Sequence, residues 1–280
     1  MRFLDVLAKL DAKDRDEAIW LLSARRRCSK SEVLLSAREP MRAKELTAWR
    51  KDWARRAKGE PLQYVARSAP FFGREFFVNR DVLIPRPETE VLVELCLSLL
   101  KDKPAARLLD VGTGTGCIAI TLKAEAPTFE VVATDISAKA LAVARKNAAA
   151  FGLEIRLERH DLFSPKLREE RWDLVVSNPP YLDFRKDKIA ANVRQWEPRG
   201  ALEPLLSARV EATRDRASWC AERILEACEK NRPSHTALEL SPRVAASLER
   251  RWKRHPSVQR AWREPDLAGR KRFLLVAWRA

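Results

Sequence analysis

The sequence predicts an α/β protein, a doubly wound seven-stranded sheet preceded by a small N-terminal helical bundle and joined to it by a β-hairpin. From residue 107 onward, apolar strand segments alternate with helical segments, as in parallel sheets covered on both faces. Residues 1–58 instead space apolar side chains at three and four, which is typical of helices. Three of the eight glycines also fall within five residues, at 112, 114 and 116, directly after the first strand segment.

These elements divide the chain into three parts. Residues 1–60 are expected to form the bundle, with Asp14 and Ser31 as helix N-caps. Residues 61–86 are expected to be a hairpin linker, because residues 64–84 mix aromatic and β-branched side chains around Pro70 and Gly73. Residues 87–280 form the α/β domain. Its last two strand segments have no helical segment between them, so one of them should run antiparallel.

The composition is that of a globular protein, with 46 % hydrophobic and 33 % charged residues and no apolar run long enough to span a bilayer. Asp5 and Asp11 interrupt the segment where a signal peptide would need an apolar core, so a cytoplasmic location is expected. The five cysteines include no CxxC pair, and the three histidines lack ligand-like spacing. We therefore expect no disulfide framework and no metal site. We also expect a monomer.

Positive charge gathers at the two ends of the chain. The formal net charge is +15, of which residues 1–70 carry +7 and residues 241–280 carry +8, while residues 71–240 are balanced. An enzyme acting on nucleic acid would usually have positive charge around its cleft. Solvated helix faces are the favoured interpretation, and no nucleic acid is required as a partner, although the basic ends could contact RNA.

The glycine cluster follows the strand segment RLLDV and opens a helix, at the edge where open α/β sheets bind ligands. We therefore predict a cofactor site at Gly112, Thr113, Gly114, Thr115 and Gly116. Part of this loop fits the dinucleotide pattern G-x-G-x-x-G/A, so a nicotinamide or flavin is one alternative. However, Asp110 lies two residues before the loop, and a carboxylate suits a ligand with an amino group and a positive charge. S-adenosylmethionine has both.

Acidic residues also follow the next two strand segments. Asp135 ends the second, 19 residues after Gly116, where a carboxylate can accept both hydroxyls of a ribose. Asp161 follows the third segment, where it could accept the adenine amino group, with Leu162 packing nearby. Together with Asp110, these carboxylates favour an adenosine-containing cofactor.

The segment SNPPY, residues 177–181, ends the fourth strand at the same edge of the sheet. A planar nitrogen, as in a carboxamide or a nucleobase amine, is a weak nucleophile that needs acceptors for its N–H bonds. The Asn178 side-chain oxygen and the Pro179 carbonyl supply two acceptors, and Tyr181 offers a ring for stacking. We predict Asn178, Pro179 and Tyr181 as catalytic residues, with Pro180 also contacting the substrate and Asn178 also contacting the cofactor.

With these motifs in view, the chain resembles the protein-(glutamine-N5) methyltransferases that modify peptide chain release factors. The resemblance rests on GEPLQYV (59–65), FFGREFFV (71–78), VLIPRPETE (82–90), LLDVGTGTGCIAI (108–120), SNPPY (177–181) and EPRGAL (197–202). It implies a Rossmann-like methyltransferase domain at residues 87–280, a substrate-recognition domain at residues 1–60, and S-adenosylmethionine as cofactor. The implied substrate is the glutamine of the Gly-Gly-Gln motif in a class I release factor.

The resemblance also implies roles for individual residues. The glycine loop corresponds to the family's cofactor loop, Asp135 to its ribose ligand, and Leu162 to a position beside the adenine. Residues 178–181 match those that hold the substrate glutamine, and Phe76 falls where the family has an aromatic or aliphatic residue against the glutamine pocket. After EPRGAL, however, the family usually runs into a segment GG-x-DGL, where this chain reads EPLLSARVEATRD.

Four alternatives remain open at this point. The chain could be the sister enzyme that acts on a ribosomal-protein glutamine, or a nucleic-acid amino-methyltransferase acting on adenine N6 or cytosine N4. A dinucleotide-dependent oxidoreductase would leave SNPPY unexplained. A non-catalytic adaptor with basic arms would not need both the glycine loop and SNPPY.

Overall fold

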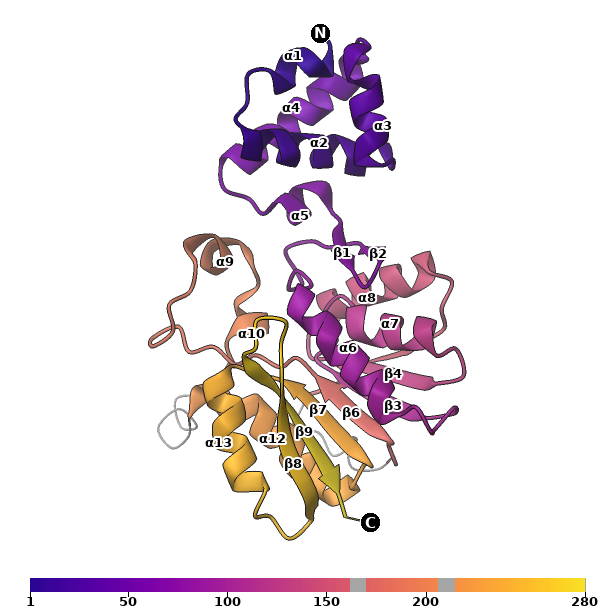
Figure 1. Ribbon diagram of the computed structural model, residues 1–280, viewed down its shortest axis with the longest axis vertical. Coiled ribbons are helices and arrows are strands. Elements are labelled where there is room, and N and C mark those ends of the chain that lie inside the picture. Colours follow the sequence, from indigo (N-terminus) through magenta and orange to yellow (C-terminus); the bar gives the residue numbers. More distant parts are fainter. Residues whose placement is uncertain (162–169, 206–214, 280) are drawn as a thin grey trace.

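The computed structural model describes residues 1–161, 170–205 and 215–279. Leu162, predicted beside the adenine, lies outside the described residues. The chain forms a helical bundle that carries the N-terminus and a larger α/β domain that carries the C-terminus, at opposite ends of the long axis (Figure 1).

The N-terminal bundle consists of short helices that share one apolar core. They are α1 (Phe3–Leu7), α2 (Ala12–Arg26), α3 (Lys30–Leu35) with the 3-10 turn η1 (Ser36–Arg38), and α4 (Ala43–Ala57). Leu22 and Val33 are fully buried in this core, and the edge of the Phe3 ring contacts Trp49, with ring centroids 5.6 Å apart.

Two helices of the bundle begin earlier than predicted. Asp11, not Asp14, caps α2, since its carboxylate accepts the Asp14 N–H at 2.8 Å. Ser29, not Ser31, caps α3 in a reciprocal capping box with Glu32. The residues predicted as caps instead lie in the first turns of these helices.

A short connection joins the bundle to the α/β domain. It contains α5 (Leu62–Ala66), which the sequence did not predict, and the antiparallel hairpin of β1 (Ala69–Phe71) and β2 (Arg74–Phe76), which it did. Val65 packs on the bundle core, whereas Tyr64 packs with Val82 and donates its hydroxyl to the Val82 carbonyl at 2.6 Å. Helix α5 therefore contacts both parts of the molecule.

The α/β domain is built on a seven-stranded sheet in the order β5-β4-β3-β6-β7-β9-β8. Its strands are β3 (Arg107–Val111), β4 (Glu130–Asp135), β5 (Arg156–Arg159), β6 (Leu174–Ser177), β7 (His235–Glu239), β8 (Val258–Pro265) and β9 (Lys271–Trp278). Strands β3 to β7 are parallel, and β9 is antiparallel to both of its neighbours. The predicted fold class and its antiparallel strand are confirmed.

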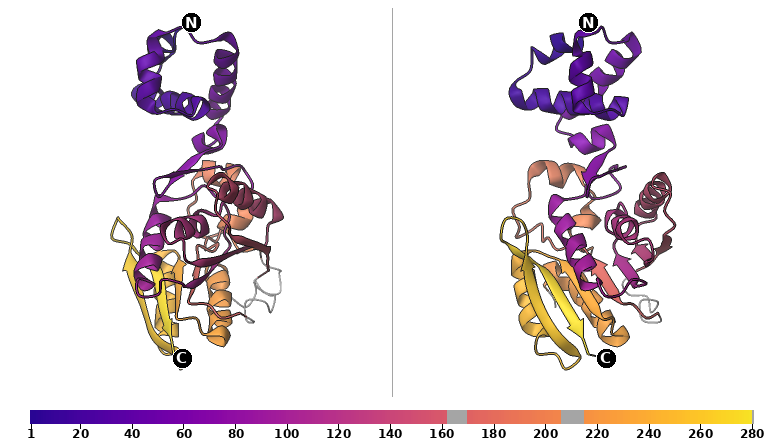
Figure 2. Two further views of the ribbon diagram at one scale, coloured as in Figure 1. Left: turned by 90° about the vertical axis from the view of Figure 1, so that its right-hand side faces the viewer. Right: turned by 45° about the vertical axis from the view of Figure 1, so that its right-hand side comes forward.

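Helices cover both faces of the sheet because its strands are apolar on both sides. Helices α6 (Pro87–Leu99), α7 (Cys117–Glu125) and α8 (Ala138–Ala150) pack on one face, and α12 (Trp219–Asn231) and α13 (Pro242–Trp252) pack on the other. Along β3, Leu108 belongs to the first core and Leu109 to the second. The short helices α9 (Ala191–Trp196) and α10 (Arg199–Leu202) lie on the side that faces the bundle (Figure 2), and the turn η3 (Arg216–Ser218) precedes α12.

In the part of the chain that the structure describes, no helix combines the length and the apolar character that crossing a membrane requires.

Candidate functional site

A cavity of about 460 Å³ lies at the carboxyl ends of β3, β4 and β6. The strand order reverses there, since β4 and β5 continue on one side of β3 and β6 and β7 on the other. Open α/β sheets bind ligands at such a point. The lining comes from these strand ends, from residues 81–86, from the segment around α10, and from the first turns of α12.

The glycine loop between β3 and α7 forms part of the cavity wall, and Gly112, Thr113, Gly114 and Thr115 all line it. Gly112 and Gly114 have left-handed backbones, with φ of +74° and +55°, and an added Cβ at either position would meet nothing within 4 Å. The N–H groups of Gly112 and Thr113 both donate to the Thr134 carbonyl, at 2.8 and 2.9 Å, which holds the loop against β4.

Gly116 is the member of the predicted loop that does not line the cavity. Its φ is +81°, and an added Cβ would lie 2.9 Å from Ile120 Cδ1 and 3.2 Å from Ala144 Cβ on α8. The third glycine therefore permits close packing of α8 against the start of α7, while the first two leave open backbone beside the cavity.

Asp135 ends β4 and lines the cavity. Its carboxylate accepts the Gly114 N–H and the Ser137 N–H, each at 2.9 Å, so it also fixes the shape of the glycine loop. Burial raises the pKa of this carboxyl, and the hydrogen bonds from backbone N–H groups oppose that effect. Because a carboxylate has about four lone pairs, acceptor capacity remains for a ligand. Asp161 is exposed on the same cavity, next to the buried His160.

Asp110 has a different place from the one its sequence position suggests. It is fully buried and is not among the residues that line the cavity. Its carboxylate accepts a hydrogen bond from the Thr113 hydroxyl at 2.6 Å, so it holds the glycine loop from the buried interior of the domain. Burial raises the pKa of the Asp110 carboxyl to about 7, although the bond from Thr113 lowers it.

Asn178, Pro179 and Pro180 follow β6 and line the same cavity as the glycine loop. Ser177, the last residue of β6, is fully buried and donates its hydroxyl to the Val111 carbonyl at 2.6 Å, which ties this segment to the end of β3. The Asn178 side-chain amide donates from Nδ2 to Thr89 Oγ1 at 3.2 Å. The structure thus brings the two predicted motifs together in one cavity.

Two predicted substrate contacts lie elsewhere. Phe76 is fully buried, does not line the cavity, and packs against the rings of Phe71 and Phe151. Its position in the hairpin places it in the core beneath α6 and α7, away from the residues that line the cavity. Tyr181 also does not line the cavity; it packs against the core under α12 and α13, and burial raises the pKa of its hydroxyl to about 12.

Several residues that shape the cavity have no role predicted from the sequence. Arg86 of the IPRPETE motif pairs with Glu197 of the EPRGAL motif, with 2.5 Å between Arg86 Nη2 and Glu197 Oε1. The Ile84 N–H lies 3.4 Å from the other carboxylate oxygen of Glu197. Trp219 and Ile224 of α12 supply an apolar wall. The motifs IPRPETE and EPRGAL could have marked Arg86 and Glu197 as residues of the site, but the sequence alone does not show that the two motifs are in contact.

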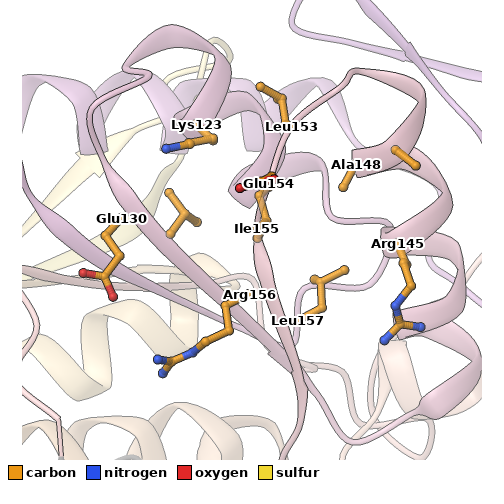
Figure 3. Close-up of a pocket in the computed structure, with 11 residues that line it drawn as sticks. Lys123, Glu130, Arg145, Ala148, Leu153, Glu154, Ile155, Arg156 and Leu157 are labelled. Atoms are coloured by element: carbon orange, nitrogen blue, oxygen red, sulfur yellow. The ribbon is translucent and has the colours of Figure 1, made fainter.

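A second hollow of about 540 Å³ opens at the edge of the sheet, beside β4, β5 and the end of α8 (Figure 3). Its charged residues do not converge on a reacting group, since Lys123 donates to the carbonyls of Pro127 and Phe129 and Arg156 pairs with Glu170. No predicted motif reaches it. Among residues 1–161, 170–205 and 215–279, no group of three His, Cys, Asp or Glu side chains could hold a metal ion.

The two basic ends of the chain do not surround the cavity. The bundle lies at one end of the long axis and α13 lies in the part of the α/β domain farther from the bundle, whereas the loop between β8 and β9 reaches up beside α10 (Figure 1). Many of the arginines in the bundle are paired, including Arg26 with Glu45 and Arg56 with Glu17, both at 2.6 Å. This arrangement is consistent with solvated faces.

Comparison with family models matches both parts of the chain. Residues 89–196 match the Methyltransferase small domain, and residues 4–66 match the PrmC N-terminal domain.

Several curated relatives bear the name Release factor glutamine methyltransferase. The relative from Koribacter versatilis is 38 % identical over 71 % of this chain and 73 % of its own length, and that from Cereibacter sphaeroides is 43 % identical over 70 % and 69 %. For the relative from Bordetella pertussis the identity is 42 % over 62 % of this chain, and the match spans 64 % of the relative, slightly less than two thirds of its length.

Solved structures share the fold at low identity. The N-terminal domain of human METTL16 is 18 % identical with a TM-score of 0.53, over 81 % of this chain and 92 % of that chain. A methyltransferase from Pyrococcus furiosus is 16 % identical with a TM-score of 0.52, over 81 % and 98 %. At such identities the likeness shows the fold alone.

Proposed function

Since the chain belongs to the release factor glutamine methyltransferase family, we propose that it methylates the glutamine of the Gly-Gly-Gln motif in class I peptide chain release factors. The methyl group would come from S-adenosylmethionine, and the acceptor would be the side-chain amide nitrogen. The observation that carries this proposal is that the glycine loop and Asn178, Pro179 and Pro180 line one cavity. A methyl donor and a planar nitrogen can therefore meet there.

The lining of the cavity suits S-adenosylmethionine. Asp135 offers carboxylate oxygens to the ribose hydroxyls, Asp161 offers an acceptor for the adenine amino group, and Ile136 and Trp219 offer apolar surface. The open backbone at Gly112 and Gly114 can approach a ligand closely. When bound, S-adenosylmethionine supplies an electrophilic methyl group on a positively charged sulfur.

The protein's own contribution is to hold the acceptor nitrogen. A carboxamide nitrogen has a delocalised lone pair and two N–H bonds. The side-chain oxygen of Asn178 and the carbonyl of Pro179 can accept those two bonds, which orients the nitrogen and stabilises the positive charge that grows on it. Methyl transfer would leave the carbon–sulfur electron pair with the departing thioether, S-adenosylhomocysteine, and a positive charge on the amide nitrogen. One of the two N–H protons, held toward Asn178 or Pro179, would then pass to solvent water, which leaves a neutral N-methylated amide. Tyr181, set back from the cavity, would act by supporting this segment.

The N-terminal bundle, residues 1–60, is proposed to bind the release factor outside its glutamine loop. Contacts that link the bundle to the cavity support this role. Glu60 pairs with Arg55 of α4 at 2.6 Å and with Arg80 at 3.1 Å, and Arg80 in turn lies over the Trp196 ring at 4.3 Å. Arg80 directly precedes the lining segment 81–86. The cytoplasmic location and the monomeric state remain predictions.

The decisive experiment incubates the purified protein with methyl-labelled S-adenosylmethionine and separate acceptors. These are a class I release factor, the same factor with its motif glutamine changed to glutamate, ribosomal proteins, and naked DNA and RNA. We expect one methyl group on the wild-type release factor and none on the glutamate variant. Label on a ribosomal protein or on nucleic acid, with the release factor unmodified, would contradict the proposal in favour of that rival.

A further inference from the structure

Asn178 begins a series of three hydrogen-bonded side chains that come from three separate parts of the sequence. Its Nδ2 donates to Thr89 Oγ1 at 3.2 Å, and the Thr89 hydroxyl donates to Glu239 Oε2 at 2.8 Å. Thr89 lies in the first turn of α6, and Glu239 ends β7. Both are almost fully buried, with 3 % and 1 % of their surface exposed.

The order of donors in this chain determines which way the Asn178 amide faces. An ionised carboxylate only accepts hydrogen bonds, so the single hydroxyl proton of Thr89 is drawn to Glu239. Thr89 then has only lone pairs to offer Asn178, and these attract the NH₂ group and not the oxygen. The Asn178 oxygen is thereby left for another donor. We propose that Thr89 and Glu239 are positioning residues that fix this rotamer, so that Asn178 Oδ1 faces the substrate nitrogen.

This inference rests on the proposed function, because it presumes an acceptor nitrogen held by Asn178. It goes further by explaining why a threonine and a buried glutamate belong to the site although neither would touch the substrate nitrogen. Without them, the amide could turn by 180° and present NH₂ to the substrate N–H, which would set two donors against each other.

The surroundings of Glu239 bring the pKa of its carboxyl group close to neutral pH. Burial raises the pKa of this carboxyl to about 7, while the hydrogen bond from Thr89 and the charge of Arg272, 3.7 Å away, lower it. Protonated Glu239 could donate to Thr89, whose own proton would then be free to point at Asn178. The titratable or charged groups that face Glu239 are Arg86, Glu88, Cys117, Tyr181 and Arg272.

The test compares three variants of the full-length protein. Thr89→Val removes the hydroxyl and keeps the shape, whereas Thr89→Ser keeps the hydroxyl. Thr236→Val is the matched control, because Thr236 is also fully buried and accepts one side-chain hydrogen bond, from Trp278 Nε1 at 2.8 Å, in the same strand as Glu239. Urea unfolding of all three corrects for general loss of stability.

We expect kcat for methylation of the release factor to fall by roughly 10- to 100-fold in Thr89→Val, since a misplaced acceptor costs turnover. The KM for release factor and the Kd for S-adenosylmethionine should change much less than kcat, by no more than about threefold, because valine keeps the shape of the cavity wall to which Thr89 contributes. Thr89→Ser and Thr236→Val should both retain kcat within about threefold, the first because its hydroxyl persists and the second because it lies outside the chain of bonds. Equal kcat in Thr89→Val and wild type, or a Thr89→Ser variant as slow as Thr89→Val, would refute the proposal.

Two further readouts separate positioning from mere structural support. In the wild type, kcat should fall as pH drops below about 7, and in Glu239→Gln this dependence should disappear, since glutamine does not titrate. In the protein without substrate, NMR should show the Asn178 side-chain NH₂ exchanging faster with water in Thr89→Val than in Thr89→Ser. Unchanged exchange would refute the hydrogen-bond chain whatever the substrate. If the wild type leaves release factor unmodified, the proposed function fails, and the same kcat comparison is made on the acceptor that takes the label.

Discussion

Replacing Gly116 by alanine tests whether the third glycine of the loop serves packing and not ligand binding. The backbone there has φ of +81°, and a left-handed backbone costs a non-glycine residue about 1–2 kcal/mol. The new Cβ would also lie 2.9 Å from Ile120 Cδ1 and 3.2 Å from Ala144 Cβ. Ile120 can shift its terminal methyl, but Ala144 is fixed to α8, so overpacking adds about 1–3 kcal/mol. The free energy of unfolding should fall by about 2–5 kcal/mol.

Gly152→Ala is the matched control. Gly152 also has a left-handed backbone, with φ of +64°, but an added Cβ would meet nothing within 4 Å. It should therefore cost only the strain of about 1–2 kcal/mol. Urea unfolding measures both variants. If they lose the same stability, close packing at Gly116 is not what requires glycine there. Removing the Ile120 terminal methyl with Ile120→Val should cost less in the Gly116→Ala background than alone, because it relieves one of the two contacts.

Three further predictions follow from the site. Gly114→Ala should leave the free energy of unfolding within about 2 kcal/mol of wild type. Calorimetry should nevertheless show clearly weaker S-adenosylmethionine binding, because the new methyl group would occupy open space beside the cavity that the ligand needs. Unchanged affinity would contradict a close approach of the ligand to this backbone. Asp135→Ala should weaken the same binding by about 1.5–3 kcal/mol, the usual range for hydrogen bonds to a charged group; equal Kd values would remove Asp135 as ribose ligand. Burial raises the pKa of Asp110 to about 7 in the folded protein, so its contribution to stability is full below the unfolded pKa near 4 and is lost as pH rises through 7. The free energy of unfolding should therefore drop by about 2 kcal/mol more between pH 5.5 and 8 in the wild type than in Asp110→Asn. Parallel curves of unfolding free energy against pH for the two proteins would show that this carboxyl does not titrate as stated.

Much of the fold could be predicted from the sequence because its signals are local. The strand–helix alternation and the cluster of glycines after RLLDV each lie within a few residues, and both hold in the structure. The cap of α8 is equally local, because Ser137 directly precedes the helix and accepts the Ala140 N–H at 3.2 Å. At α2 and α3, several residues of suitable type stand close together, and local pattern could not choose Asp11 over Asp14 or Ser29 over Ser31.

The interior of the site could not be predicted, because it is made by residues distant in sequence. Thr89 and Glu239 are 150 positions apart, and Asn178 and Thr89 are 89 apart. No spacing rule connects them; only the order of the strands brings the end of β7 beside the start of α6. Phe76 shows that a local pattern can also fit two different locations. An aromatic residue in a short hairpin can face a pocket or a core, and only the packing of Phe71 and Phe151 against it decides for the core.

The pairing of Arg86 with Glu197 joins the IPRPETE and EPRGAL motifs in this structure. The Glu197 side chain is only 2 % exposed, and a carboxylate at such a site needs a partner, which Arg86 supplies at 2.5 Å. This bond ties the lining segment 81–86 to the segment around α10, so the two motifs form one wall of the cavity.

The departure that follows EPRGAL can be understood in the same terms. The first residue after EPRGAL is Glu203, which is 1 % exposed and pairs with Arg199 at 2.7 Å and with Arg216 at 3.4 Å. Its carboxylate also accepts the Phe184 N–H at 3.0 Å. Ion pairs thus anchor the described flanks of this segment, on either side of residues 206–214. Glu203 therefore holds these two flanks to each other, whereas Asn178 donates to Thr89, which lies in a different part of the cavity wall.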